Sequence, residues 1–230
     1  SLSADFAKKE IHLFTPKKSL LMSYGGRSDG SSAGKNPPSG VVFNYLLGAE
    51  GDSTSSLKLI IMNSEDDTVR TFTSKTGEPI QTRRGMQRSP GLGTKKGMNR
   101  FIWNVRVADL TKVPKLFTSG SPAGYKVGPG KYKAVMILEK KTSASTFEIA
   151  PDPRNDLTTR YDRQQNMLKE IYDATNKLYG SVNSLRSVRN QLQGITKNVK
   201  GMKNTEKLVE AGEAVIETLS EWEKSVVSLK

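Results

Sequence analysis

The feature that most constrains the fold is the distribution of proline along the chain. All ten prolines lie at or before Pro153, and 16 of the 20 glycines precede Asn155. Proline interrupts helices and central strands, and both residue types mark turns. A stretch of 77 residues without proline, after so many turn signals, therefore predicts long helices. We expect a β part and an α part in separate segments of the chain.

Residues 40–153 show the two-residue alternation that is typical of half-buried strands. Ser64–Asp67 predicts a turn, after which Val69–Phe72 returns as a hairpin partner. The other apolar lines are Val41, Phe43, Tyr45 and Leu47; Leu57, Leu59 and Ile61; Phe101, Trp103 and Val105; Tyr132, Ala134, Met136 and Leu138; and Phe147 and Ile149. Six or seven short strands in about 110 residues predict an antiparallel β-sandwich of the immunoglobulin or fibronectin type III kind.

Residues 1–39 combine a strand signal with a loop signal. The apolar run from Ile11 to Leu21 predicts a short strand, which either joins the sandwich or belongs to a preceding domain. Residues 23–40 are rich in glycine and serine, a composition that is typical of a flexible loop.

Residues 154–230 carry the pattern of an antiparallel helical hairpin, with helices over about 156–200 and 203–229. Asn155 or Asp156 is expected to cap the first helix. Its apolar seam consists of Ile171, Leu178, Leu185, Leu192 and Val199, with Tyr161, Leu168 and Val182 at complementary positions and Thr175 and Arg189 as polar exceptions. After a break at 201–204, a second stripe has 4-3-4-3-4 spacing and consists of Leu208, Gly212, Val215, Leu219, Trp222 and Val226.

The first helix has more apolar residues than a single partner helix can cover. Beside the seam runs a flank of Tyr172, Tyr179, Val188 and Ile195. We therefore expect part of this helix to pack elsewhere, on the sandwich, on an upstream domain or on another copy of the chain. The helices also differ in charge, since 157–200 has 8 basic and 3 acidic residues and 203–230 has 4 and 6.

A basic segment between the expected strands is the candidate binding site. The net charge is +13, and residues 1–154 contribute +11 of it, with 24 basic and 13 acidic residues. Residues 75–97 predict a long loop with the candidate polyanion-binding residues Arg83, Arg84, Arg88, Lys95 and Lys96. A solvated surface would have the same composition. Nucleic acid is not favoured as a ligand, because this loop has no aromatic residue on which bases could stack.

The chain lacks the residues that most catalytic sites and metal sites require. The chain has no cysteine and a single histidine, His12, so thiolate metal sites and cysteine nucleophiles are excluded. Neither a phosphate-binding loop nor a G-x-S-x-G elbow is present. We assign no catalytic, cofactor-binding or metal-binding residue and predict that the chain is not an enzyme. No apolar run approaches the roughly 18 residues of a membrane span.

Several short motifs follow one another in a recognisable order. They are Asn36-Pro37-Pro38-Ser39-Gly40 before the strand from Val41, Leu57 to Ile61 followed by Val69 to Phe72, Gly97 to Arg106, Pro129-Gly130-Lys131-Tyr132, Asp152-Pro153-Arg154, and the helical run Asn183 to Leu192. This succession resembles the C-terminal region of large bacterial proteins with sortilin-like, bacterial-neuraminidase-repeat β-propellers, which are often labelled glycosyl hydrolases. The β part is also similar to the Ig-like domain of flagellar hook-capping proteins.

The resemblance implies an accessory role outside the cytoplasm. In such proteins the propeller lies upstream, and any hydrolase chemistry would belong to it. Here Ser64-Glu65-Asp66-Asp67-Thr68 lacks the glycine of a propeller turn, so no catalytic residue is carried over. We expect an extracellular or periplasmic accessory, scaffolding or interaction module, whose partners are the propeller, another protein or a further copy through the helices. The alternative is a carbohydrate- or polyanion-binding module that uses residues 75–97.

Overall fold

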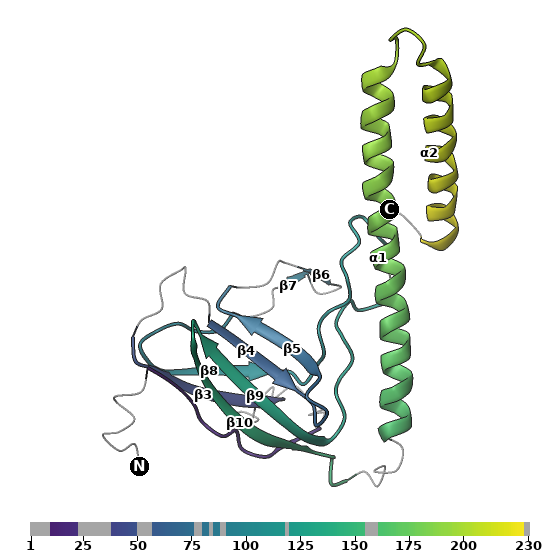
Figure 1. Ribbon diagram of the computed structural model, residues 1–230. Coiled ribbons are helices and arrows are strands. Elements are labelled where there is room, and N and C mark those ends of the chain that lie inside the picture. The colour runs from purple at the N-terminus through teal and green to yellow at the C-terminus, as the bar shows by residue number, and fades with distance from the viewer. Residues whose placement is uncertain are drawn as a thin grey trace. The chain divides into compact units, whose positions relative to one another are not determined.

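The computed structural model (Figure 1) describes residues 10–22, 38–49, 57–75, 80–82, 85–87, 91–117, 120–154 and 161–227. The chain divides into two compact units. The first unit contains Ser1–Ala108 and Ala123–Leu168, and the second unit contains Asp109–Pro122 and Lys169–Lys230. The irregular segment 109–122 therefore belongs with the helices, although it lies between strands in the sequence.

The first unit contains two sheets and a separate two-stranded ribbon. The smaller sheet has the order β1-β3-β8, the larger sheet has the order β2-β10-β9-β4-β5, and β6 pairs with β7. The strands of the sheets are β1 (Ile11–Leu13), β2 (Ser19–Leu20), β3 (Val41–Leu47), β4 (Leu57–Met62), β5 (Thr68–Thr73), β8 (Gly97–Trp103), β9 (Gly130–Leu138) and β10 (Lys141–Ala150). The ribbon consists of β6 (Ile80–Thr82) and β7 (Gly85–Gln87).

Aromatic side chains from the two sheets meet in one core. Phe43 on β3 lies 5.4 Å from Phe147 on β10, and Phe72 on β5 lies 4.6 Å from Phe101 on β8, measured between ring centroids. Trp103 is fully buried, and its indole nitrogen donates a hydrogen bond to the Arg106 carbonyl at 2.8 Å. A β part separate from the helical part is thus confirmed. The larger sheet is curled, and the immunoglobulin-like class stays a prediction.

The segment from Ile11 to Leu21 joins the sheets of the first unit and does not form part of a separate domain. β1 pairs antiparallel with β3, and β2 pairs parallel with β10. The backbone amide of Leu13 also donates to the Ser143 hydroxyl on β10 at 2.8 Å. Residues 23–37 of the expected loop lie outside the described residues.

Two local expectations in the first unit were wrong. The segment 75–97 is not irregular throughout, because it contains the β6–β7 ribbon, whose three-residue strands are too short to show an alternating pattern. Val105 is buried as expected, but β8 ends two residues earlier and the backbone at Val105 has a φ of 54°. This left-handed conformation turns the chain out of the sheet.

The helical hairpin of the second unit is confirmed. α1 (Tyr161–Val199) and α2 (Glu206–Val226) lie side by side in Figure 1, and the turn between them contains two residues with positive φ, Gly201 and Asn204. The Thr205 hydroxyl donates to the Val199 carbonyl at 2.8 Å and so ties the end of α1 to the start of α2. The expected capping residues Asn155 and Asp156 lie outside the described residues.

The face by which α2 packs on α1 overlaps only in part with the expected stripe. Of the six residues of that stripe, Leu208, Val215, Trp222 and Val226 are exposed, whereas Gly212 and Leu219 are half-buried. The residues that turn toward α1 include Gly212, which lies against Thr196, and Glu223, which is buried. The expectation was wrong for the four exposed residues, because a hydrophobic pattern alone places every glutamate on the solvent side.

Candidate functional site

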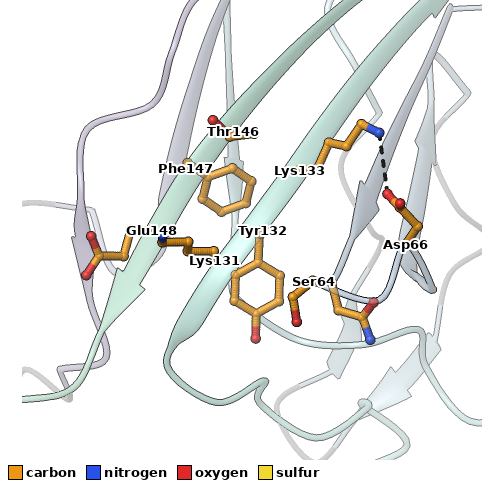
Figure 2. Close-up of a pocket in the computed structure, with 9 residues that line it drawn as sticks. Ser64, Asp66, Lys131, Tyr132, Lys133, Thr146, Phe147 and Glu148 are labelled. Atoms are coloured by element: carbon orange, nitrogen blue, oxygen red, sulfur yellow. Dashed lines mark hydrogen bonds and ion pairs between the residues drawn. The ribbon is translucent and has the colours of Figure 1, made fainter.

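A groove in the first unit lies beside β9 and β10 and has a volume of about 710 Å³ (Figure 2). Three of its charged side chains form ion pairs, Lys133 with Asp66 at 3.4 Å and Glu148 with Lys18 at 2.7 Å. The other lining residues are Asn63, Ser64, Lys131, Tyr132, Thr146 and Phe147. Tyr132 is largely buried and donates to the Gly128 carbonyl at 2.8 Å.

The chemistry of this groove does not favour proton transfer at neutral pH. Burial, and to a smaller extent the neighbouring Tyr125, raises the pKa of Tyr132 to about 12. The two carboxylates of the groove are each held by a lysine at the surface. We therefore do not place a catalytic site here.

The structure describes two of the five predicted polyanion-binding residues. Arg83, Arg84 and Arg88 lie outside the described residues. Lys95 and Lys96 are both exposed and immediately precede β8. The Lys95 carbonyl accepts a hydrogen bond from the Asn99 amide at 2.6 Å, which holds the backbone near this pair of lysines.

Within the described residues, no group of three or more histidine, cysteine, aspartate or glutamate side chains could hold a metal ion. The helices in the described ranges are also not long and apolar enough to cross a membrane.

The second unit contains a buried ionic cluster between its two helices. Glu223 on α2 is 1% exposed, and its two carboxylate oxygens each accept a hydrogen bond at 2.6 Å, one from Arg186 and one from Arg189. Arg189 also donates to the Ser220 hydroxyl at 3.3 Å. Burial would raise the pKa of Glu223, but the hydrogen bonds and charges of the two arginines lower it below its ordinary value. This cluster fixes the register of α2 on α1.

Close contact between the helices also depends on Gly212. A Cβ atom at this position would lie 2.4 Å from the Thr196 methyl carbon on α1. Thr196 is buried, and its hydroxyl donates to the Leu192 carbonyl at 3.0 Å. The Glu223 cluster and the Thr196–Gly212 contact together define which residues of α1 and α2 lie at the same level of the hairpin.

Segment 109–122 covers one flank of α1. The Asn183 amide donates to the Lys112 carbonyl at 2.9 Å, and Arg186 donates to the Pro114 carbonyl. Val113 of the segment forms a small core with Val182 of α1 and Val227 after α2, against which Tyr179 packs. Part of the first helix therefore packs on a segment that the sequence did not connect with it.

The opposite flank of the hairpin exposes a set of large apolar side chains, which we call the apolar face. It consists of Val188 and Ile195 on α1 and Leu208, Val215, Trp222 and Val226 on α2, which are 37–55% exposed. A helix turns about 100° per residue. Val188 therefore lies about 120° around α1 from the buried Val182, in the sense opposite to Asn183, which is covered by segment 109–122.

Both helices contribute to the same face. Trp222 and Val215 lie about 100° and 80° around α2 from the buried Glu223, in the same rotational sense in which Val188 and Ile195 turn away from Val182. The rotation is counted on each helix from the side that faces the other helix. When two facing helices are antiparallel, side chains that are rotated in the same sense from this side lie on the same side of the pair. The two exposed lines therefore form one continuous surface, which the sequence pattern did not indicate as a unit.

No known protein family, curated protein or solved structure matches this chain. The resemblance to sortilin-like propeller proteins accordingly stays a prediction.

Proposed function

We propose that this chain is a non-catalytic interaction module whose helical hairpin binds another polypeptide through the apolar face. The observation that carries the proposal is the exposure of six large apolar side chains on one side of the hairpin. Soluble monomers rarely leave contiguous apolar patches of more than a few hundred Å² open to water. An apolar stripe on paired helices is a common way to bind a further helix.

The wider setting of the module is proposed from the order of its sequence motifs. A sandwich of the immunoglobulin type, followed by a hairpin, fits the C-terminal end of a larger secreted propeller protein. The module would then serve as an accessory or scaffolding part outside the cytoplasm, and any hydrolase chemistry would lie in the propeller. Binding of a carbohydrate or polyanion by residues 75–97 stays a prediction, since Lys95 and Lys96 alone of its five residues are described.

Thiol reactivity tests whether the apolar face is covered. The chain has no cysteine, so a single introduced cysteine is an unambiguous reporter. Val188→Cys lies on the apolar face, and Asn190→Cys lies on an exposed polar part of the same helix. In the protein assembled with its natural partner, we expect Cys at 188 to react at least about tenfold more slowly than Cys at 190. Equal reaction rates in that assembly would contradict the proposed function.

A further inference from the structure

Resting on the proposed function, we infer that the partner on the apolar face is a second copy of this chain. The two hairpins form an antiparallel four-helix bundle, in which α1 of each copy packs against α2 of the other. Three observations lead to this arrangement: the layered order of the apolar residues, the charges of the two helices, and the uncharged border of the face.

The apolar residues form layers at regular heights along the hairpin. The contacts of Arg186 with Glu223 and of Thr196 with Gly212 fix the register between α1 and α2. In this register Val188 lies level with Trp222, and Ile195 lies level with Val215. Both lines repeat every seven residues, which is the spacing of coiled-coil and bundle cores. The pair Leu192 with Leu219 lies between these two layers, and the pair Leu185 with Val226 lies on the other side of the Val188 layer. Leu185, Leu192 and Leu219 are half-buried.

A second hairpin can complete every layer without a change of register. A two-fold axis parallel to the helices does not change the position of a residue along the helix axis. Each layer of one hairpin therefore lies level with the same layer of the second hairpin. Val188 and Trp222 then meet the same two residues of the partner, and Ile195 and Val215 do likewise. Such a self-complementary patch is the requirement for a closed dimer with two-fold symmetry. The same axis brings α1 next to the partner's α2 in antiparallel orientation.

The charges of the helices favour this pairing over contact between two α1 helices. Residues 174–199 of α1 contain four basic residues, Lys177, Arg186, Arg189 and Lys197, and no acidic residue. Residues 206–226 of α2 contain six glutamates and two lysines. As whole helices, α1 beside the partner's α2 therefore brings opposite net charges together, whereas two neighbouring α1 helices would bring like net charges together and repel each other.

The immediate border of the apolar face carries no charge that would keep two copies apart. Its outer edge consists of Ser184 and Gln191 on α1 and Ala211 and Thr218 on α2, all of which are exposed. A partner of a different sequence would be selected by charges at this border. An uncharged border around a regular apolar pattern favours a copy of the same surface.

The size of the face is adequate for a dimer. α2 has 21 residues and is therefore about 31 Å long. With a distance of about 10 Å between helix axes, the two helices present a surface about 20 Å wide. The resulting footprint of about 600 Å² approaches the roughly 800 Å² per partner of a standard stable interface.

The test is the mass of the full chain in solution with matched substitutions. We expect the wild-type chain to sediment with twice the 25.3 kDa mass of one chain at micromolar concentration. Val188→Glu combined with Ile195→Glu should give a monomer, while the control Asn190→Glu should stay a dimer. Both substituted residues on the face are about half exposed, so circular dichroism should show unchanged helix content in both variants.

Disulfide formation then tests which helices meet. Ile195→Cys and Val215→Cys share a layer, so a mixture of the two variants should form the mixed disulfide at least about tenfold faster than either variant alone forms its own. Faster homodisulfides of Ile195→Cys would overturn the pairing of α1 with the partner's α2. A wild-type chain that stays monomeric up to about 100 μM would overturn the dimer. Protection of Cys at 188 in a natural assembly with another protein would still support the proposed function in that case.

Discussion

At the scale of single residues, Glu223 is a buried carboxylate that two arginines hold in place. It is 1% exposed and is held by Arg186 and Arg189. Loss of one member of a buried ion pair is costly because the remaining charges stay desolvated. We expect Glu223→Gln to lower the free energy of unfolding of the helical unit by about 3 kcal/mol, the lower end for such pairs, because both arginines keep some solvent contact.

The same carboxylate predicts the response to acid. Its pKa is lowered in the folded chain, so the unfolded chain binds the proton more readily. The stabilisation is complete above the ordinary pKa of glutamate, about 4.3, and is lost as the pH falls through the lowered value. Thermal unfolding followed by helix signal between pH 7 and 2 should show a smaller pH dependence for Glu223→Gln than for wild type.

The control for these measurements is Glu213→Gln. Glu213 pairs with Lys200 at 3.3 Å on the surface, where its side chain is 58% exposed. Exposed pairs contribute about 0–1 kcal/mol. If Glu213→Gln and Glu223→Gln changed stability and its pH dependence equally, the buried cluster would not have the role assigned to it.

At the scale of elements, the contact between α1 and α2 depends on a glycine. Alanine normally stabilises a helix by about 1 kcal/mol relative to glycine. At Gly212, however, the new Cβ atom would lie 2.4 Å from the Thr196 methyl carbon, and such overpacking costs about 1–3 kcal/mol. We expect Gly212→Ala to lower the Tm of the hairpin.

Gly194→Ala is the matched control on α1. A Cβ atom there would meet nothing within 4 Å, so its effect is limited to helix propensity and the Tm should rise. Thermal unfolding by circular dichroism compares the two variants directly. A rise of Tm for both would mean that the helices do not approach closely at Gly212.

The strands and helices also show which structural features a sequence pattern can predict. Alternation in β3 and the break near Gly201 predicted the strand and the hairpin, because burial of one face leaves a periodic signal. Tyr179 and Val188 were grouped as one flank, although nine residues place them on opposite sides of a helix. Tyr179 packs on segment 109–122 and Val188 lies on the apolar face. A contact with a segment that is distant in sequence has no local periodicity.

The candidate site was only partly predictable for a related reason. Seven-residue spacing indicated that α1 has apolar residues beyond those one helix can cover. It did not indicate which line faces α2, because a pattern of apolar residues assigns Glu223 to solvent and treats Arg189 as a polar exception in the seam, although the two form an ion pair between the helices. The spacing of Arg186 and Arg189, three residues apart on a helix, opposite a glutamate-rich helix, was the signal that could have shown it.

At the scale of the whole molecule, the chain combines two compact units, to which we assign different roles in our proposal. The first unit has an aromatic core shared by two sheets, and we propose that it has the accessory or scaffolding role. The second unit exposes the apolar face, through which we propose that it binds a partner. The central claim is therefore that a partner, in our inference a second copy, covers the apolar face.

Trp222 reports on this claim most directly. Its side chain is 41% exposed in a single chain, whereas Trp103, the other tryptophan, is 0% exposed. We compare the quenching of tryptophan fluorescence by acrylamide in wild type and in Trp222→Phe. The part of the quenching that is lost in Trp222→Phe measures the access of acrylamide to the apolar face. We predict weak quenching of Trp222 at micromolar concentration and stronger quenching as dilution separates the copies. Strong quenching of Trp222 at every concentration, with a sedimentation mass of one chain, would contradict the account.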